Sequence, residues 1–173
     1  FLFQQQIATS ARSLYLIAGS LILLALILAL AERISAFRRE ADSLTLGDGI
    51  VVGLAQALAL VPGSSRSGTT ITAGLFLGLT REAAARFSFL LSIPAVIASG
   101  LFEMYEARHS LTGGTAINLF VAAAVSAVSG YAAIAFLLRY LRTHTTFVFI
   151  WYRIFLGGLI FLLLFLGTIS PFS

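Results

Sequence analysis

Charged residues divide this chain into long apolar runs, and the lengths of these runs predict its helices. One bilayer crossing requires about 20 apolar residues in a helix. Four runs are close to this length, at residues 14–31, 83–106, 117–138 and 147–169. The polar segment 32–42 should form a loop in water, and breaks are expected at 113–114 and 139–144. We therefore expect four transmembrane helices.

The apolar stretch at 47–79 differs from these four runs because it is too long and is interrupted. One straight helix of this length would extend about 50 Å, whereas the hydrocarbon core is about 30 Å thick. Pro62 removes a backbone donor and disfavours helical geometry in the residue before it. We predict two half-helices, 49–61 and 69–79, joined by a tip loop at 62–68. Together they should form a re-entrant hairpin that returns to the side from which it entered.

The distribution of arginine supports this hairpin independently. All eleven basic residues are arginine, and loops rich in basic residues stay in the cytoplasm. With a re-entrant hairpin, seven arginines fall on one side, namely Arg33, Arg38, Arg39, Arg81, Arg86, Arg139 and Arg142, while Arg12 and Arg108 fall on the other. A full crossing at 47–79 would move four of the seven and remove the asymmetry. The seven-arginine side is therefore expected to be cytoplasmic.

Composition restricts the class of protein further. Hydrophobic residues make up 59% of the chain, mean hydropathy is +1.00, and only 10% of residues are charged, against roughly 25% in soluble domains. This excludes a soluble globular protein. The absence of cysteine excludes disulfides and thiolate metal sites, and the scattered net charge of +4 argues against a nucleic-acid partner. We expect a single all-α integral membrane domain over 1–173, surrounded by membrane lipids. Because the chain opens without methionine, we expect it to be a fragment.

Arg66 is the first candidate for chemistry because it is the only charge between Asp48 and Arg81. At the tip of the hairpin it would lie near the membrane centre, where an arginine costs about 2.5 to 3.5 kcal/mol and is a functional residue by default. Hydroxyls surround it, and two glycines leave the backbone N–H groups accessible; these neighbours are Gly63, Ser64, Ser65, Ser67, Gly68, Thr69 and Thr70.

The start of the second half-helix adds partial positive charge and unpaired N–H donors beside Arg66. A guanidinium group also matches phosphate oxygens in a two-pronged geometry. The loop is therefore expected to bind an oxyanion, most naturally phosphate. The structural alternative is that Ser67 or Thr69 caps the helix and that Arg66 pairs with a buried carboxylate.

Several other polar residues have less certain roles. Gln56 could reach the cavity or form a hydrogen bond between helices. Ser88 and Ser92 precede Pro94, which predicts a kinked helix whose freed carbonyls accept from the two hydroxyls, with a cavity-lining role as the alternative. Arg153 is expected to extend to the cytoplasmic interface rather than to meet a ligand.

The acidic and histidine residues offer no group for catalysis near Arg66. Asp48 is the nearest acid in sequence, but the first half-helix should place it about 20 Å from the tip, where its charge favours the helix dipole. His109 and His144 are expected in solvated loops.

The run from Pro62 to Thr70, preceded by residues 56–60, closely resembles the second signature of the undecaprenyl-diphosphate phosphatase, or bacitracin-resistance, family. Its pattern PGxSRSGxT matches without departure. Residues 87–94 and the pair Tyr152-Arg153 are similar to later segments of that family. The resemblance covers almost the whole chain.

This resemblance implies a hydrolase of the bacterial inner membrane that removes the terminal phosphate of undecaprenyl diphosphate, so that the lipid carrier for cell-wall synthesis is recycled. It implies one half of an inverted-repeat fold, in which the other half carries a glutamate-rich signature and the ligands of a divalent cation, Mg²⁺ or Ca²⁺. On this view the chain itself supplies no metal ligand. The residues expected to act directly are Arg66 and Ser65 as catalytic groups and Gly63, Ser64, Ser67, Gly68, Thr69, Thr70 and Gln56 as substrate-binding groups.

A second hypothesis is a transporter or flippase of a polyprenyl phosphate, because broken helices with an anion-binding tip also occur in carriers. Carboxylates facing Arg66 from the missing half would favour the enzyme. The partners expected are the polyprenyl diphosphate, the missing N-terminal half and, as one arrangement, a second copy in a homodimer. A purely structural subunit is disfavoured by the buried arginine and its hydroxyls.

Overall fold

The computed structural model describes residues 13–108 and 113–171, and within them the chain is helical and has no strand. The α-helices are α2 (Leu14–Ile34), α3 (Leu46–Ala57), α4 (Arg66–Phe76), α5 (Arg81–Ala107), α6 (Gly113–Thr143) and α7 (Phe147–Phe165). Short 3-10 turns at Ala41–Ser43 and Leu58–Leu60 precede and follow α3. By length and composition, α2, α5, α7 and the part of α6 from Ile117 could each cross a membrane. The protein is an all-α integral membrane protein.

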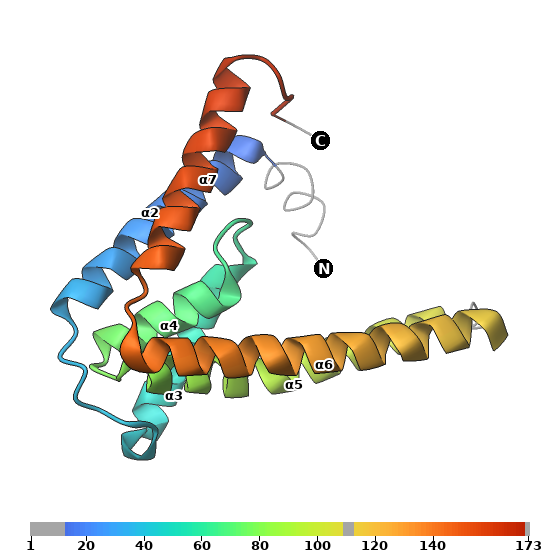
Figure 1. Ribbon diagram of the computed structural model, residues 1–173, viewed down its shortest axis with the longest axis horizontal. Helices are drawn as coiled ribbons and strands as arrows, with labels where there is room; N and C mark the ends of the chain where they lie inside the picture. The colour runs from blue at the N-terminus through green and yellow to red at the C-terminus, as the bar shows by residue number, and fades with distance from the viewer. Residues whose placement is uncertain (1–12, 109–112, 172–173) are drawn as a thin grey trace.

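The helices form two arms with the α3–α4 hairpin between them (Figure 1). One arm is the pair α2 and α7, which lie side by side, and the other is the long pair α5 and α6. Helix α4 contacts α2, α3 and α5, so it is the element that joins both arms. Its close contact with α5 depends on Gly74, where a Cβ atom would lie 2.9 Å from the Cβ of Ala84.

Five ends of the four long helices extend beyond the runs expected from the sequence. Helix α6 continues through 139–143, where we expected a break, and α2 continues through Glu32 and Arg33. Helix α5 begins at Arg81, two residues earlier than expected, and ends at Ala107, one residue later. Helix α6 begins at Gly113 instead of residue 117, so the break expected at 113–114 is wrong. The expectation stopped each helix at the edge of the apolar run. Backbone hydrogen bonds need no apolar side chains, so a helix that spans the hydrocarbon can continue beyond it through charged residues. Among these four helices, only α7 is shorter than expected, ending at Phe165 instead of residue 169. The half-helices α3 and α4 also end earlier than predicted, at Ala57 instead of residue 61 and at Phe76 instead of residue 79.

The two ends of the α3–α4 hairpin meet at Arg39. The Arg39 guanidinium pairs with Asp48 at the start of α3, with N–O distances of 2.6 and 3.0 Å, and donates to the carbonyl of Leu77 just after α4, at 3.1 Å. The Gly78 carbonyl accepts from the backbone N–H groups of Arg38 and Arg39. The hairpin therefore starts and finishes at one place, which supports a segment that enters and leaves on the same side.

Asp48 has a more specific role than the dipole interaction expected from sequence. Its side chain forms a reciprocal capping box with Thr45 at the start of α3, in addition to the ion pair with Arg39. The hydrogen bonds from Arg39, followed by those from Thr45, hold the pKa of the Asp48 carboxyl well below its usual range. Asp48 is thus a structural anion at the mouth of the hairpin.

Glu32 is buried, which corrects the expectation that the whole segment 32–42 lies in water. Its side chain is 2% exposed, and its Oε1 atom accepts from the Arg81 Nε atom at 2.5 Å. The Oε2 atom accepts from the hydroxyl of Thr146 at 2.9 Å, and that residue is also buried. One carboxylate therefore connects the end of α2, the start of α5 and the start of α7.

The hairpin leads to a prediction about topology. Single cysteines introduced at Ser43 and Thr80 of this cysteine-free chain should show the same accessibility to an impermeant maleimide applied to intact cells, because both sites lie beside the hairpin ends. Thr168→Cys, beyond the other end of α7, should show the opposite accessibility. Different labelling of the Ser43 and Thr80 sites would mean that 46–79 crosses the membrane completely.

Candidate phosphate-binding site at the start of α4

Helix α4 begins at Arg66, three residues before the expected start at Thr69. Ser65 is the N-cap, and its Oγ atom accepts from the backbone N–H of Gly68 at 3.3 Å. The tip loop is therefore 61–65 instead of 62–68, and Arg66, Ser67 and Gly68 form the first turn of the helix. The expectation missed this start because it read both flanking glycines as parts of one loop. Of the two hydroxyls considered as caps, neither Ser67 nor Thr69 has this role.

The first turn of α4 presents unpaired donors. The backbone N–H groups of Arg66 and Ser67 have no hydrogen-bond partner in the part of the chain that the structure describes. Ser65 has a φ of +63°, which is unusual for a residue other than glycine. Unpaired N–H groups at a helix start favour an anion, and strained backbone often occurs at functional positions.

The Arg66 side chain is exposed and makes no hydrogen bond or ion pair to any residue of the described ranges 13–108 and 113–171. It lines a cavity of about 240 Å³ together with Ser67 and with Ser88, Phe89 and Ser92 of α5. The structural alternative required a buried carboxylate partner for Arg66, and the described residues provide none. The guanidinium is thus available to a ligand in this cavity.

Arg153 does not extend to the interface, which corrects the sequence expectation. This α7 residue is 8% exposed, and its Nη2 atom donates to the carbonyls of Gly63 and Ser64 at 3.0 and 2.9 Å. Its Nε atom is buried and has no partner among the described residues. A second guanidinium therefore lies directly against the backbone of the tip loop.

Gly63 in the tip loop and Gly68 in the first turn of α4 allow close approach by α2 and α7. A Cβ atom at Gly68 would lie 2.5 Å from the Nη1 atom of Arg153. Gly63 has a φ of +87°, and a Cβ atom there would meet the carbonyl oxygen of Ile17 at 2.7 Å. The hydroxyl of Ser20, also on α2, donates to the carbonyl of Pro62 at 2.6 Å. The loop is thus held from both sides.

Thr69 and Thr70 are buried, and their hydroxyls bond within the protein. Both donate to the carbonyl of Arg66 at 2.9 Å. The Thr70 and Ser88 hydroxyls are 2.6 Å apart, which connects α4 to α5. The prediction that Ser88 and Ser92 donate to a carbonyl freed by Pro94 is wrong. Ser88 pairs with Thr70, and the Ser92 hydroxyl donates to the carbonyl of Phe89 at 2.7 Å, whereas Pro94 frees the carbonyl of Leu90. The substrate-binding role expected for the two threonines stays a prediction.

The remaining candidate residues lie around the same loop. Ser64 is 2% exposed and contributes its carbonyl to Arg153. Ser65, Ser67 and Gly68 line a second cavity, of about 150 Å³, whose other walls come from α2, α4, α6 and α7. The Oε1 atom of Gln56 is buried without a partner among the described residues. These contacts bring the loop residues together. The substrate-binding role expected for Gln56 stays a prediction.

The described residues do not fit a divalent cation. They contain no group of three or more His, Asp or Glu side chains that could hold a metal ion. Glu32 and Asp48 are each paired with an arginine. His144 follows the end of α6, where its ring stacks on Tyr140, and His109 lies outside the described residues.

The Thr70–Ser88 contact allows a prediction about stability. Thr70→Val keeps the shape of the side chain and removes the hydroxyl, which should lower the free energy of unfolding by about 1 kcal/mol, as for other hydrogen bonds between membrane helices. Denaturant unfolding of the detergent-solubilised protein measures this. Thr72→Val, which also loses an internal hydroxyl contact but none to another helix, is the control. An equal loss in both variants would mean that the bond to α5 adds nothing.

The fold and this site together define an integral membrane protein with a candidate anion-binding site at the tip of a helical hairpin. The family model described as bacitracin resistance protein BacA matches residues 1–159, and the chain belongs to this family. It is similar to the undecaprenyl-diphosphatase of Chloroherpeton thalassium, with 53% identity over 99% of this chain and 64% of that protein. The undecaprenyl-diphosphatase of Myxococcus xanthus is 54% identical over 94% of this chain and 54% of that protein. The chain thus spans less than two thirds of the length of these curated relatives.

Proposed function

We propose that the full-length protein hydrolyses undecaprenyl diphosphate to undecaprenyl phosphate and inorganic phosphate, and that this chain supplies the diphosphate-binding loop. One observation carries the proposal. The exposed Arg66 guanidinium and the unpaired N–H groups of Arg66 and Ser67 occupy the tip of a hairpin whose loop is held by Arg153. The family membership and the names of the relatives support the substrate.

The chemistry available to these residues is charge stabilisation and positioning, which dominate phosphoryl transfer. The Arg66 guanidinium would bind two oxygens of the terminal phosphate and stabilise the charge that develops on them during transfer. The backbone N–H groups of Arg66 and Ser67 would donate to the same phosphate. The Ser65 Oγ atom accepts from Gly68, so its own proton remains available to a phosphate oxygen.

We propose that the group which activates the nucleophile, and any divalent cation, are provided by the additional length that the relatives possess. Phosphoryl transfer commonly uses a cation held by carboxylates, and among the described residues no carboxylate pairs with Arg66. We further propose the bacterial plasma membrane as the location and recycling of the cell-wall lipid carrier as the role. The transporter alternative gains no support from the relatives named above.

Phosphate release in detergent tests this function. The full-length protein should release inorganic phosphate from undecaprenyl diphosphate when divalent cations are added, and the 173-residue chain alone should release none. If the full-length protein leaves the diphosphate intact but moves a labelled polyprenyl phosphate across vesicle membranes, the transporter hypothesis is right. Turnover by the chain alone that disappears with Arg66→Ala would show that the catalytic groups have been misplaced.

A further inference from the structure

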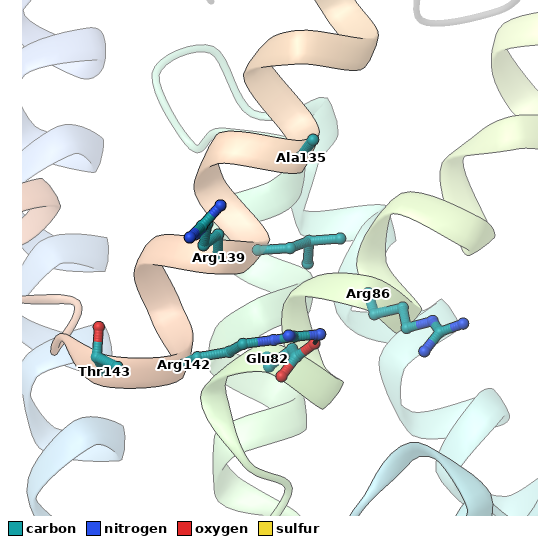
Figure 2. Close-up of a pocket in the computed structure, with 7 residues that line it drawn as sticks. Glu82, Arg86, Ala135, Arg139, Arg142 and Thr143 are labelled. Carbon is teal, nitrogen blue, oxygen red and sulfur yellow. Dashed lines mark hydrogen bonds and ion pairs between the residues drawn. The ribbon is translucent and has the colours of Figure 1, made fainter.

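A separate cavity of about 700 Å³ lies between α5 and α6. Its charged wall consists of Glu82 and Arg86 from α5 and Arg139 and Arg142 from α6, and its apolar wall includes Ala135 and Leu138. Figure 2 shows the Arg142 side chain reaching across from α6 to Glu82 on α5. None of the residues that line this cavity belongs to the hairpin or its tip loop.

The charges of this cavity are not balanced. Three arginines and one glutamate give it a net charge of +2 (3 minus 1). The Glu82 carboxylate is already paired with Arg142, at an N–O distance of 2.7 Å. Arg86 and Arg139 are exposed, and neither forms a hydrogen bond or ion pair within the described part of the chain. Two guanidinium groups therefore remain for an anion from outside the chain.

The depth of these two arginines can be calculated from the helix ends. Arg86 lies five residues after the start of α5 and Arg139 four residues before the end of α6, which corresponds to about 8 and 6 Å along the axes. The Arg142–Glu82 bond joins these two ends. The helices have 27 and 31 residues, or about 40 and 46 Å, so each exceeds the hydrocarbon core of about 30 Å by roughly 5 to 8 Å on each side. For helices centred in the bilayer, both arginines lie within about 3 Å of the edge of the hydrocarbon core, from where their long side chains can reach lipid phosphates.

Within the described part of the chain, the helix faces around the cavity are apolar and exposed. Leu90 and Ile93 on α5 are 56% and 49% exposed, and Phe136 on α6 is 71% exposed. Acyl chains attached to a bound phosphate could lie along these side chains. A free phosphate ion would make no use of them, nor of the apolar part of the cavity wall.

We propose that this cavity binds the headgroup of an anionic membrane phospholipid between Arg86 and Arg139, whose side chains lie on opposite sides of the Arg142–Glu82 pair (Figure 2). Basic pockets between transmembrane helices at the cytoplasmic level bind lipid headgroups of this kind. The net positive charge selects against zwitterionic headgroups, because their ammonium group would meet unbalanced arginines. This site is independent of the diphosphate-binding loop.

The test measures lipid binding by native mass spectrometry of the full-length protein in detergent. The probes are short-chain phosphatidylglycerol, short-chain phosphatidylcholine and inorganic phosphate. Arg86→Gln/Arg139→Gln should weaken phosphatidylglycerol binding at least tenfold. Arg33→Gln/Arg38→Gln, which removes the same charge from the same side of the membrane, should leave it unchanged. Arg86→Lys/Arg139→Lys keeps both charges and should bind phosphatidylglycerol more tightly than Arg86→Gln/Arg139→Gln does. This comparison controls for misfolding.

Three outcomes would overturn the proposal. Equal loss of binding in the two glutamine variants would show attraction by diffuse charge. Equal binding of phosphatidylcholine would show a site without charge selectivity. Displacement of phosphatidylglycerol by inorganic phosphate at matching concentrations would show a free-anion site with no contribution from acyl chains.

Discussion

Replacing Arg66 with lysine is expected to lower the kcat of the full-length protein toward a polyprenyl diphosphate by about 10²- to 10³-fold, the usual effect of losing one donor that stabilises transition-state charge. Lysine keeps the positive charge but lacks the planar pair of donors that matches two phosphate oxygens. The effect should fall mainly on kcat rather than KM, because the donors act on charge that develops during transfer. Steady-state kinetics on a detergent-solubilised polyprenyl diphosphate measure both constants.

Arg33→Lys is the matched control for this experiment. Arg33 is also exposed and lies at the end of α2, outside the residues assigned to the loop, so its substitution should leave kcat unchanged. The thermal unfolding temperature of both variants should equal that of the parent protein. A near-normal kcat for Arg66→Lys together with a lower unfolding temperature would mean that Arg66 has a structural role.

Replacing Arg153 with leucine is expected to lower kcat by on the order of 100-fold, although Arg153 belongs to a different helix. The substitution removes both hydrogen bonds to the carbonyls of Gly63 and Ser64, so the loop that presents Arg66 is free to shift. A displacement of about 1 Å in a catalytic group can lower the rate about 100-fold. Kinetics of the full-length variant, measured with the same substrate, test this expectation.

A double-mutant cycle separates positioning by Arg153 from a general loss of stability. Gly68→Ala places a Cβ atom 2.5 Å from the Arg153 Nη1 atom, and overpacking of this kind costs about 1 to 3 kcal/mol of unfolding free energy. In the Arg153→Leu background, Gly68→Ala should cost less unfolding free energy. The difference is the interaction energy between positions 68 and 153. Gly158→Ala on α7, whose Cβ atom would meet nothing within 4 Å, is the control. Additive costs for Gly68→Ala and Arg153→Leu would contradict the contact.

The sequence was sufficient to predict the architecture, because length and hydropathy alone distinguish spanning runs from the interrupted stretch at 47–79. It also led to the correct family, through the motif around Arg66. The exact helix ends could not be predicted in this way. A serine cap at Ser65 and charged last turns at Glu32 and Arg139 depend on local hydrogen bonds and on the headgroup layer, which hydropathy does not describe.

The long-range partners could not be predicted from the sequence either. Arg153 lies within an apolar run next to aromatic residues, a pattern that also fits a side chain at the interface. Its real partners are backbone carbonyls, which carry no sequence signal. Glu32 likewise looked like the first residue of a polar loop. A buried carboxylate needs specific partners, and here they come from segments 49 and 114 residues away.

The contact between Arg153 and Gly63 joins residues 90 positions apart, and it has a consequence for biogenesis. A chain made at about 5 to 20 residues per second reaches Arg153 roughly 5 to 18 s after the tip loop has been synthesised. During this interval the hairpin has been synthesised, but the side chain that secures its loop does not yet exist. The candidate anion-binding site is thus among the last features to be completed, and a ribosome that stops before α7 leaves a hairpin whose loop lacks its second guanidinium.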